Sequence, residues 1–212
     1  MVSLQFPTLF LILCCANLSN VMCLDCTANH KQNGCFEWYP NNTLVCYGTI
    51  GFNNELQGAY YNKNRLHLLL CNLEQDVLNL SEISHHFLFL VTLDVHNSNI
   101  TTIDHNEAAD GTLPYLQVLN VSHNELQRIM LPHLHALERL DLRHNRFTDL
   151  RAYDLVNLPN LRSILLAGNP WECEQTMLWL LEPQKYSLSI QQTNERMTCA
   201  GKSIMVNKYW EF

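Results

Sequence analysis

The chain has 212 residues, a formal net charge of −7 at pH 7 and 16% charged residues. An acidic chain without clusters of lysine or arginine does not favour nucleic acid or an anionic membrane surface as a partner. It has seven glycines, and it lacks a phosphate-binding loop, an HExxH motif and a nucleophile elbow, so we expect neither an enzyme nor a cofactor.

The first 23 residues have the features of a secretory signal peptide. They contain no Asp, Glu, Lys or Arg, and the apolar run Leu9–Ala16 is too short to span a bilayer. Val21 and Cys23 suit the −3 and −1 positions of a cleavage site. We therefore expect a secreted, extracellular protein without membrane insertion.

Removing residues 1–23 leaves an even number of cysteines, which favours disulfides in a secreted chain. The six are Cys26, Cys35, Cys46, Cys71, Cys173 and Cys199. The four that come first allow three connectivities. We favour Cys26–Cys35 with Cys46–Cys71, because Cys46 falls in a predicted cap strand one repeat before Cys71.

A repeated pattern, LxxLxLxxNxL, indicates the architecture. Residues 116–126, 137–147 and 161–171 follow it, and residues 90–100 follow it with Ser98 at the Asn position. A weaker fifth copy places Leu66, Leu68, Cys71 and Leu73 at the matching positions. The central residues Leu66, Leu93, Leu119, Leu140 and Ile164 are then separated by 27, 26, 21 and 24 residues.

The pattern predicts a leucine-rich-repeat solenoid, an α/β fold with a curved parallel sheet and an irregular convex side. The LxL segment alternates as a strand does, and the Asn that follows turns the chain, its amide bonding backbone groups of the adjacent turn. A second inward residue (Ile103, Ile129 or Leu150) anchors the outer arc. Amphipathic helices are a poor alternative, because they would not repeat Asn at one phase.

Both ends of an open solenoid need caps. We expect an N-terminal cap rich in cysteine and aromatic residues at 24–60, about five repeats at 61–170 and a C-terminal cap at 171–212. The segment 169–173 (NPWEC), the later Trp179-Leu180 and Cys199 resemble the C-terminal flank of extracellular leucine-rich-repeat proteins. Gln175 stands where that family has another cysteine, so the resemblance implies a reduced cap closed by one disulfide, Cys173–Cys199.

A short secreted chain with few repeats and no coiled coil also resembles the coil-less leucine-rich immune proteins of insects. That resemblance implies a role in innate immunity.

Residues that flank the inward leucines form the concave face and are the candidate binding residues. They are Thr92, Asp94, His96, Asn120, Arg139, Asp141 and Arg143. A solvated strand face that only keeps the solenoid soluble is an equal alternative. His96, His123 and His144 lie near strand ends, and we interpret them as surface residues before the turn rather than as a metal site or proton sensor.

Glycosylation sequons occur at Asn41, Asn79, Asn99 and Asn120. Asn120 belongs to the concave face, so we expect glycans on the other three and a bare Asn120. An occupied Asn120 would move the binding site to a cap, an edge or the convex arc.

The sequence favours recognition of another extracellular protein and leaves open a monomer, a homo-oligomer or a hetero-oligomer. Two alternatives stay open. One is a structural or matrix component that self-associates, and the other is a clamp that inhibits an enzyme.

Overall fold

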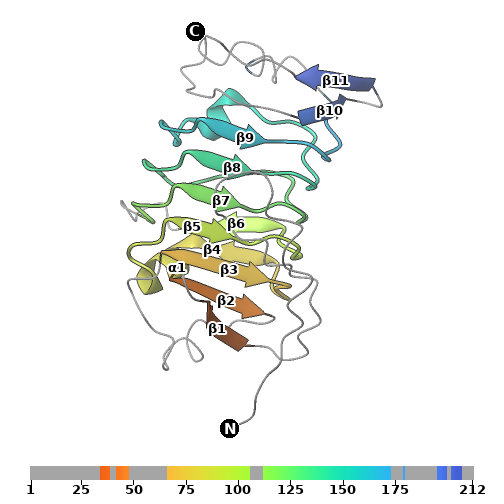
Figure 1. Ribbon diagram of the computed structural model, residues 1–212. Coiled ribbons are helices and arrows are strands. Elements are labelled where there is room, and N and C mark those ends of the chain that lie inside the picture. The colour runs from red at the N-terminus through yellow and green to blue at the C-terminus, as the bar shows by residue number, and fades with distance from the viewer. Residues whose placement is uncertain are drawn as a thin grey trace.

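The computed structural model describes residues 34–38, 42–47, 66–105, 112–172, 179, 195–199 and 202–206. One sheet of seven strands, stacked as successive rungs, forms one side of the molecule (Figure 1). From the second strand onward the neighbouring strands are parallel, while the first strand pairs with the second antiparallel. In spatial order the strands are β1 (Gly34–Trp38), β2 (Thr43–Tyr47), β3 (His67–Cys71), β5 (Thr92–Asp94), β7 (Val118–Asn120), β8 (Arg139–Asp141) and β9 (Ser163–Leu165).

The strand register confirms the predicted solenoid and four of its five strand centres. Leu93, Leu119, Leu140 and Ile164 face one another across the sheet and are buried. Residues 116–121 and 137–142, where helices would have contradicted the solenoid, contain β7 and β8. The fold is therefore a leucine-rich-repeat solenoid.

The predicted centre of the first repeat, Leu66, is wrong by two residues. Leu68 is the residue that pairs with Leu93, and Leu66 lies before the strand with 38% of its surface exposed. A slip of two residues keeps the same side chains on the same face, so alternation alone did not separate the two registers. Cys71 consequently ends β3 instead of occupying the Asn position, which Leu73 takes. The backbone N–H of Leu73 donates to Ser98 Oγ at 3.0 Å.

The convex side is irregular, as expected from the unequal repeat lengths. It contains β4 (Val77–Asn79) paired in parallel with β6 (Thr102–Asp104), the helix α1 (Leu80–His86) and the 3-10 helix η1 (Ala152–Leu155). Asn79 caps α1, its Oδ1 accepting from Glu82 N at 2.9 Å. Among the described residues, no helix combines the length and the apolar character needed to cross a bilayer.

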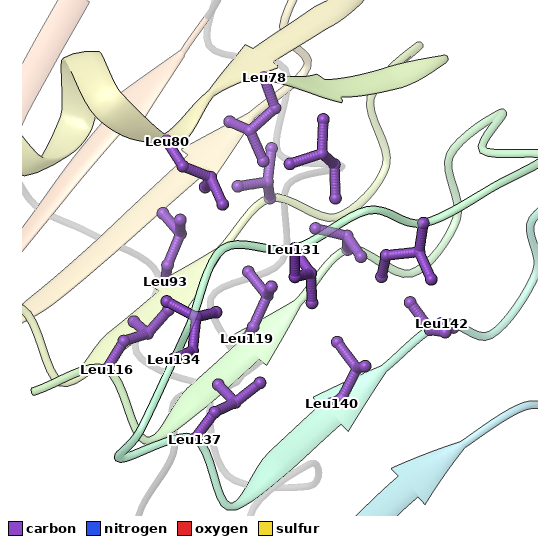
Figure 2. Packing of buried hydrophobic residues seen from close by; sticks show 14 of the residues in the cluster. Leu78, Leu80, Leu93, Leu116, Leu119, Leu131, Leu134, Leu137, Leu140 and Leu142 are labelled. Atoms are coloured by element: carbon purple, nitrogen blue, oxygen red, sulfur yellow. The ribbon is translucent and has the colours of Figure 1, made fainter. Parts of the chain in front are cut away.

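The core lies between the sheet and the convex arcs. Leucines of the strands, such as Leu119 and Leu140, meet leucines of the outer segments, such as Leu131 and Leu134 (Figure 2). The predicted anchors of the outer arc, Ile103, Ile129 and Leu150, are buried in the same cluster. No repeat buries its apolar face alone, so each depends on its neighbours.

Buried asparagines join the repeats, as predicted. Asn145 donates from Nδ2 to the carbonyl oxygen of Val121 in the preceding repeat at 2.9 Å, and its Oδ1 accepts from Leu126 N at 3.0 Å. Asn124 and Asn169 make the equivalent bonds. Backbone groups at these turns lie away from water, and the amides supply the partners they need.

Two buried tryptophans cover the C-terminal end of the described repeats. Trp171 stacks on Phe147 with ring centroids 5.9 Å apart and donates from Nε1 to Leu166 O, while Trp179 donates to Leu150 O. The hairpin of β10 (Glu195–Cys199) and β11 (Lys202–Val206) follows. The boundaries of the caps stay predictions.

Two cysteines of the first rungs are disulfide-bonded, Cys46 and Cys71. The register sets Cys46 opposite Leu70 and Cys71 opposite Tyr47. The two cysteines are therefore offset by one residue along neighbouring strands. Their pairing with each other stays a prediction. The predicted Cys26–Cys35 and Cys173–Cys199 bonds fall on side chains outside the described residues.

The hydrogen bonds of Asn124, Asn145 and Asn169 to neighbouring repeats form an asparagine ladder. The variant Asn145→Asp tests whether this ladder joins the repeats. The substituted side chain keeps its shape and its acceptor but loses the Nδ2 donor, and it places a carboxylate against the carbonyl oxygens of Val121, Leu142 and Arg143. We expect the free energy of unfolding to fall by about 3 kcal/mol or more, measured by urea denaturation. Asn160→Asp, at an exposed residue, is the control and should cost less than about 1 kcal/mol. Equal costs for the two variants would contradict the ladder.

Candidate functional site

The outward side chains of four consecutive strands line a shallow pocket on the concave face. Because strand residues alternate between faces, the residues flanking each inward leucine point away from the core. The pocket encloses about 150 Å³. Its lining consists of Thr92, Asp94, Val118, Leu119, Asn120, Arg139, Leu140, Asp141, Ser163 and Leu165.

The structure brings the sequence-predicted binding residues to this one place. Five of the seven, Thr92, Asp94, Asn120, Arg139 and Asp141, line the pocket. The other two, His96 and Arg143, each lie two residues past a pocket carboxylate and contact it. Their role in binding stays a prediction.

Asp141 is held by the arginine two residues along the chain. Its side chain is largely buried, and Arg143 Nε lies 3.0 and 3.1 Å from its two carboxylate oxygens. Arg143 Nη2 and the backbone N–H of Arg143 donate to the same carboxylate. A bidentate pair of this kind is strong and fixed in direction, so it neutralises Asp141 within the chain.

Asp94 and Asn120 occupy the same position on neighbouring strands and are also held locally. Asp94 Oδ1 lies 2.6 Å from His96 Nδ1. Asn120 Oδ1 accepts from the backbone N–H of Ser122 at 3.0 Å. Each of the three polar side chains in this row therefore contacts the residue two positions further on, which fixes the shape of the pocket wall.

Arg139 differs from the other charged residues of the pocket. Its strand neighbours in the register are Val118 and Ser163, and its side chain is exposed. Within the residues that the structure describes, its guanidinium has no hydrogen-bond or ion-pair partner.

A histidine column lies just beyond the strand ends. The rings of His123 and His144 stack with centroids 4.2 Å apart and an interplanar angle of 19°. Both residues have positive φ, as does Gly168 at the same position of the next repeat. Two features require glycine at position 168. Its φ is positive, and a Cβ there would collide with the His144 ring. His96 does not join the stack and bonds Asp94 instead.

The column does not resemble a metal centre. No group of three His, Cys, Asp or Glu side chains in the described part of the chain could hold a metal ion. Burial lowers the pKa of His123, and the nearby His144, Arg143 and His96 lower it further against the opposing effect of Asp141. The neutral imidazole is therefore the form that the folded protein favours.

Sequence reasoning missed an exposed aromatic pair that joins two repeats. Phe89 and Tyr115 stack with centroids 5.6 Å apart although both residues are exposed. Each lies four residues before the central leucine of its repeat, Leu93 or Leu119. Large apolar residues at repeat positions that the pattern leaves free were the available signal.

The sequons differ in their surroundings. Asn99 is exposed, whereas Asn79 uses its side chain to cap α1 and Asn120 lies in the pocket. Asn41 falls outside the described residues. A glycan on Asn120 would fill the pocket between Asp94 and Asp141.

Comparisons with known proteins agree with the fold. Residues 128–170 match the family model described as leucine rich repeat. The protein singed wings 2 of Drosophila melanogaster is 32% identical over 164 residues, covering 71% of this chain and 31% of that protein. A Lymnaea stagnalis protein provisionally named as the neurotrophin receptor LTRK 1 is 34% identical over 90 residues, covering 42% of this chain and 11% of that protein.

A crystal structure of the TLR13–ssRNA13 complex superposes with a TM-score of 0.62 at 21% identity, covering 78% of this chain and 23% of that one. This similarity shows the fold. The chain spans less than a third of the length of the curated relatives it matches. The repeat register and the match at residues 128–170 both agree with a leucine-rich-repeat solenoid.

The lowered pKa of His123 predicts a dependence of stability on pH. The folded pKa lies below the unfolded value of 6.5, so this stabilisation is complete above pH 6.5 and is lost as the pH falls through the folded pKa. We expect the urea midpoint to fall between pH 7.5 and pH 5, and less steeply in His123→Gln. Burial also lowers the pKa of His67, which should supply part of the remaining slope.

Gln127→Ala, at an exposed residue that does not titrate, is the control for this titration and should leave the slope unaltered. A His123→Gln protein with the wild-type slope would show that the stacked pair does not sense pH.

Proposed function

We propose that this chain is a secreted recognition protein that binds another extracellular protein through its concave face. The observation that carries the proposal is the pocket, which four consecutive strands line with outward side chains in register. Leucine-rich-repeat solenoids are typical of recognition proteins, because their extended curved sheets present many side chains at once. A role in immunity, which the resemblance to insect immune proteins implies, is part of the proposal.

The charge pattern favours a protein over a nucleic acid as the ligand. The solved TLR13 complex contains an RNA, and a phosphate backbone requires several unneutralised cations. Here Arg143 is committed to Asp141, Asp94 lies in the same pocket, and the chain has a formal net charge of −7. A single protein segment with mixed polar and apolar side chains suits this surface better.

Self-association is the alternative that a specific observation favours. The stacked and exposed pair Phe89 and Tyr115 is an apolar surface feature of the kind that marks contact surfaces. A clamp that inhibits an enzyme would also bind through the concave face. Recovery of an enzyme as the partner would distinguish this alternative.

Capture from native extracellular fluid, with cross-linking and mass spectrometry, tests concave recognition. Ser163→Trp places a large side chain in the pocket, and Thr148→Trp makes the same kind of change at an exposed residue outside the strands. We expect Ser163→Trp to weaken a heterologous partner at least about tenfold and Thr148→Trp to leave its affinity within about twofold. Recovery of only the chain itself, or equal affinity for both variants, would reject concave recognition.

Glycan occupancy gives a second test of which surface binds the partner. We expect Asn120 to be bare and Asn99 to be glycosylated, because Asn120 lines the pocket and Asn99 is exposed. Intact-mass analysis before and after glycosidase treatment, with site mapping, measures both. A glycan on Asn120 would exclude a flat partner from the pocket and move the proposed site to a cap, an edge or the convex arc.

A further inference from the structure

The charged residues of the pocket are neutralised unequally. The carboxylate of Asp141 receives four hydrogen bonds, all from Arg143, and Asp94 bonds His96. The guanidinium of Arg139 has no such partner among the described residues. Among the described residues, the Arg139 guanidinium is thus a strong donor on the concave face that no internal bond uses.

The positions of the neighbouring carboxylates explain why Arg139 has no ion-pair partner among the described residues. Of the two carboxylates next to Arg139 in the sequence, Glu138 makes no ion pair with it and Asp141 is already bound to Arg143. Asp94 lies on β5, two strands from β8, and at a strand spacing of about 4.8 Å that is roughly 9–10 Å away across the sheet. The register neighbours of Arg139, Val118 and Ser163, carry no charge.

The pocket beside Arg139 has an apolar part. Val118 and Leu165 contribute outward apolar side chains to its lining, whereas the side chains of Leu119 and Leu140 belong to the buried core. Its volume of about 150 Å³ suits one large side chain rather than an extended ligand. Arginine is enriched in binding hot spots, which lie in pockets that the partner fills and shields from water.

We propose that Arg139 is the anchor of the concave face and binds a carboxylate of the partner, from an Asp or Glu that neighbours a large apolar residue seated in the pocket. This inference rests on the proposed function and specifies the chemistry of its partner. A guanidinium binds a carboxylate through two parallel hydrogen bonds, which lysine cannot reproduce. A single carboxylate is also tolerated near Asp94, where a chain of phosphates would be repelled.

A display library of random 12-residue peptides, selected on the immobilised full chain, supplies a defined probe. We expect the enriched peptides to share an acidic residue next to a large apolar one. Arg139→Ala should lower their affinity at least about tenfold, Arg139→Lys should restore only part of it, and Arg139→Glu should abolish binding. Arg162→Ala, at an exposed arginine just before β9 and outside the pocket lining, should stay within about twofold of wild type.

The variants separate this inference from the proposed function. Peptides that Ser163→Trp excludes but Arg139→Ala still binds at full affinity would overturn the anchor and leave concave recognition standing. Peptides unaffected by either change, or no enrichment at all, would overturn both. Arg139→Ala must keep the wild-type urea midpoint, and we expect it to, because its side chain is exposed and makes no bond within the described residues.

Discussion

The structure depends on one repeated interaction, the buried asparagine that bonds the backbone of the preceding repeat. Asn124, Asn145 and Asn169 each donate to carbonyl groups on both sides of the turn and accept from a backbone N–H. A side-chain amide can donate to the carbonyl groups through its nitrogen and accept from the N–H group through its oxygen. Alanine and leucine have no side-chain donor or acceptor. This ladder keeps the strands in register while the outer arcs vary in length, so the concave face stays regular although the convex side does not.

The turn beside the ladder also controls what lies at the edge of the concave face. The residue before each ladder position has positive φ: Asn97, His123, His144 and Gly168 share this geometry. Such a conformation is uncommon outside glycine and asparagine, so the repeat requires it even where the residue is histidine. The stack of His123 on His144 follows from the spacing of adjacent rungs. The lowered pKa of His123 follows from its partial burial at this turn and, second, from the neighbouring His144.

The sequence predicted the solenoid, the strands from Leu93 to Ile164 and the outward position of the binding candidates, because inward leucines and the asparagine repeat at fixed phase. It misplaced the first repeat, where Leu66, Leu68 and Leu70 alternate without an asparagine to choose among them. It also treated Arg139 and Arg143 alike. Which of two arginines pairs with a nearby carboxylate depends on rotamers and side-chain direction, and residue spacing does not specify these.

This division between fixed and free positions limits what similarity to relatives can say about function. Inward leucines, ladder residues and turn residues recur wherever the fold recurs, so an identity of 32% with singed wings 2 does not by itself assign a partner. The outward residues can vary without loss of the fold, because changing one alters neither the core nor the asparagine ladder. Function on such a scaffold is set by a few outward side chains. Here the contacts of Asp94 with His96 and of Asp141 with Arg143 shape the pocket wall. Among the described residues, Arg139 is the charged side chain of this wall that no internal pair uses. The outward charge that the chain leaves unpaired therefore distinguishes this concave face from others built on the same scaffold.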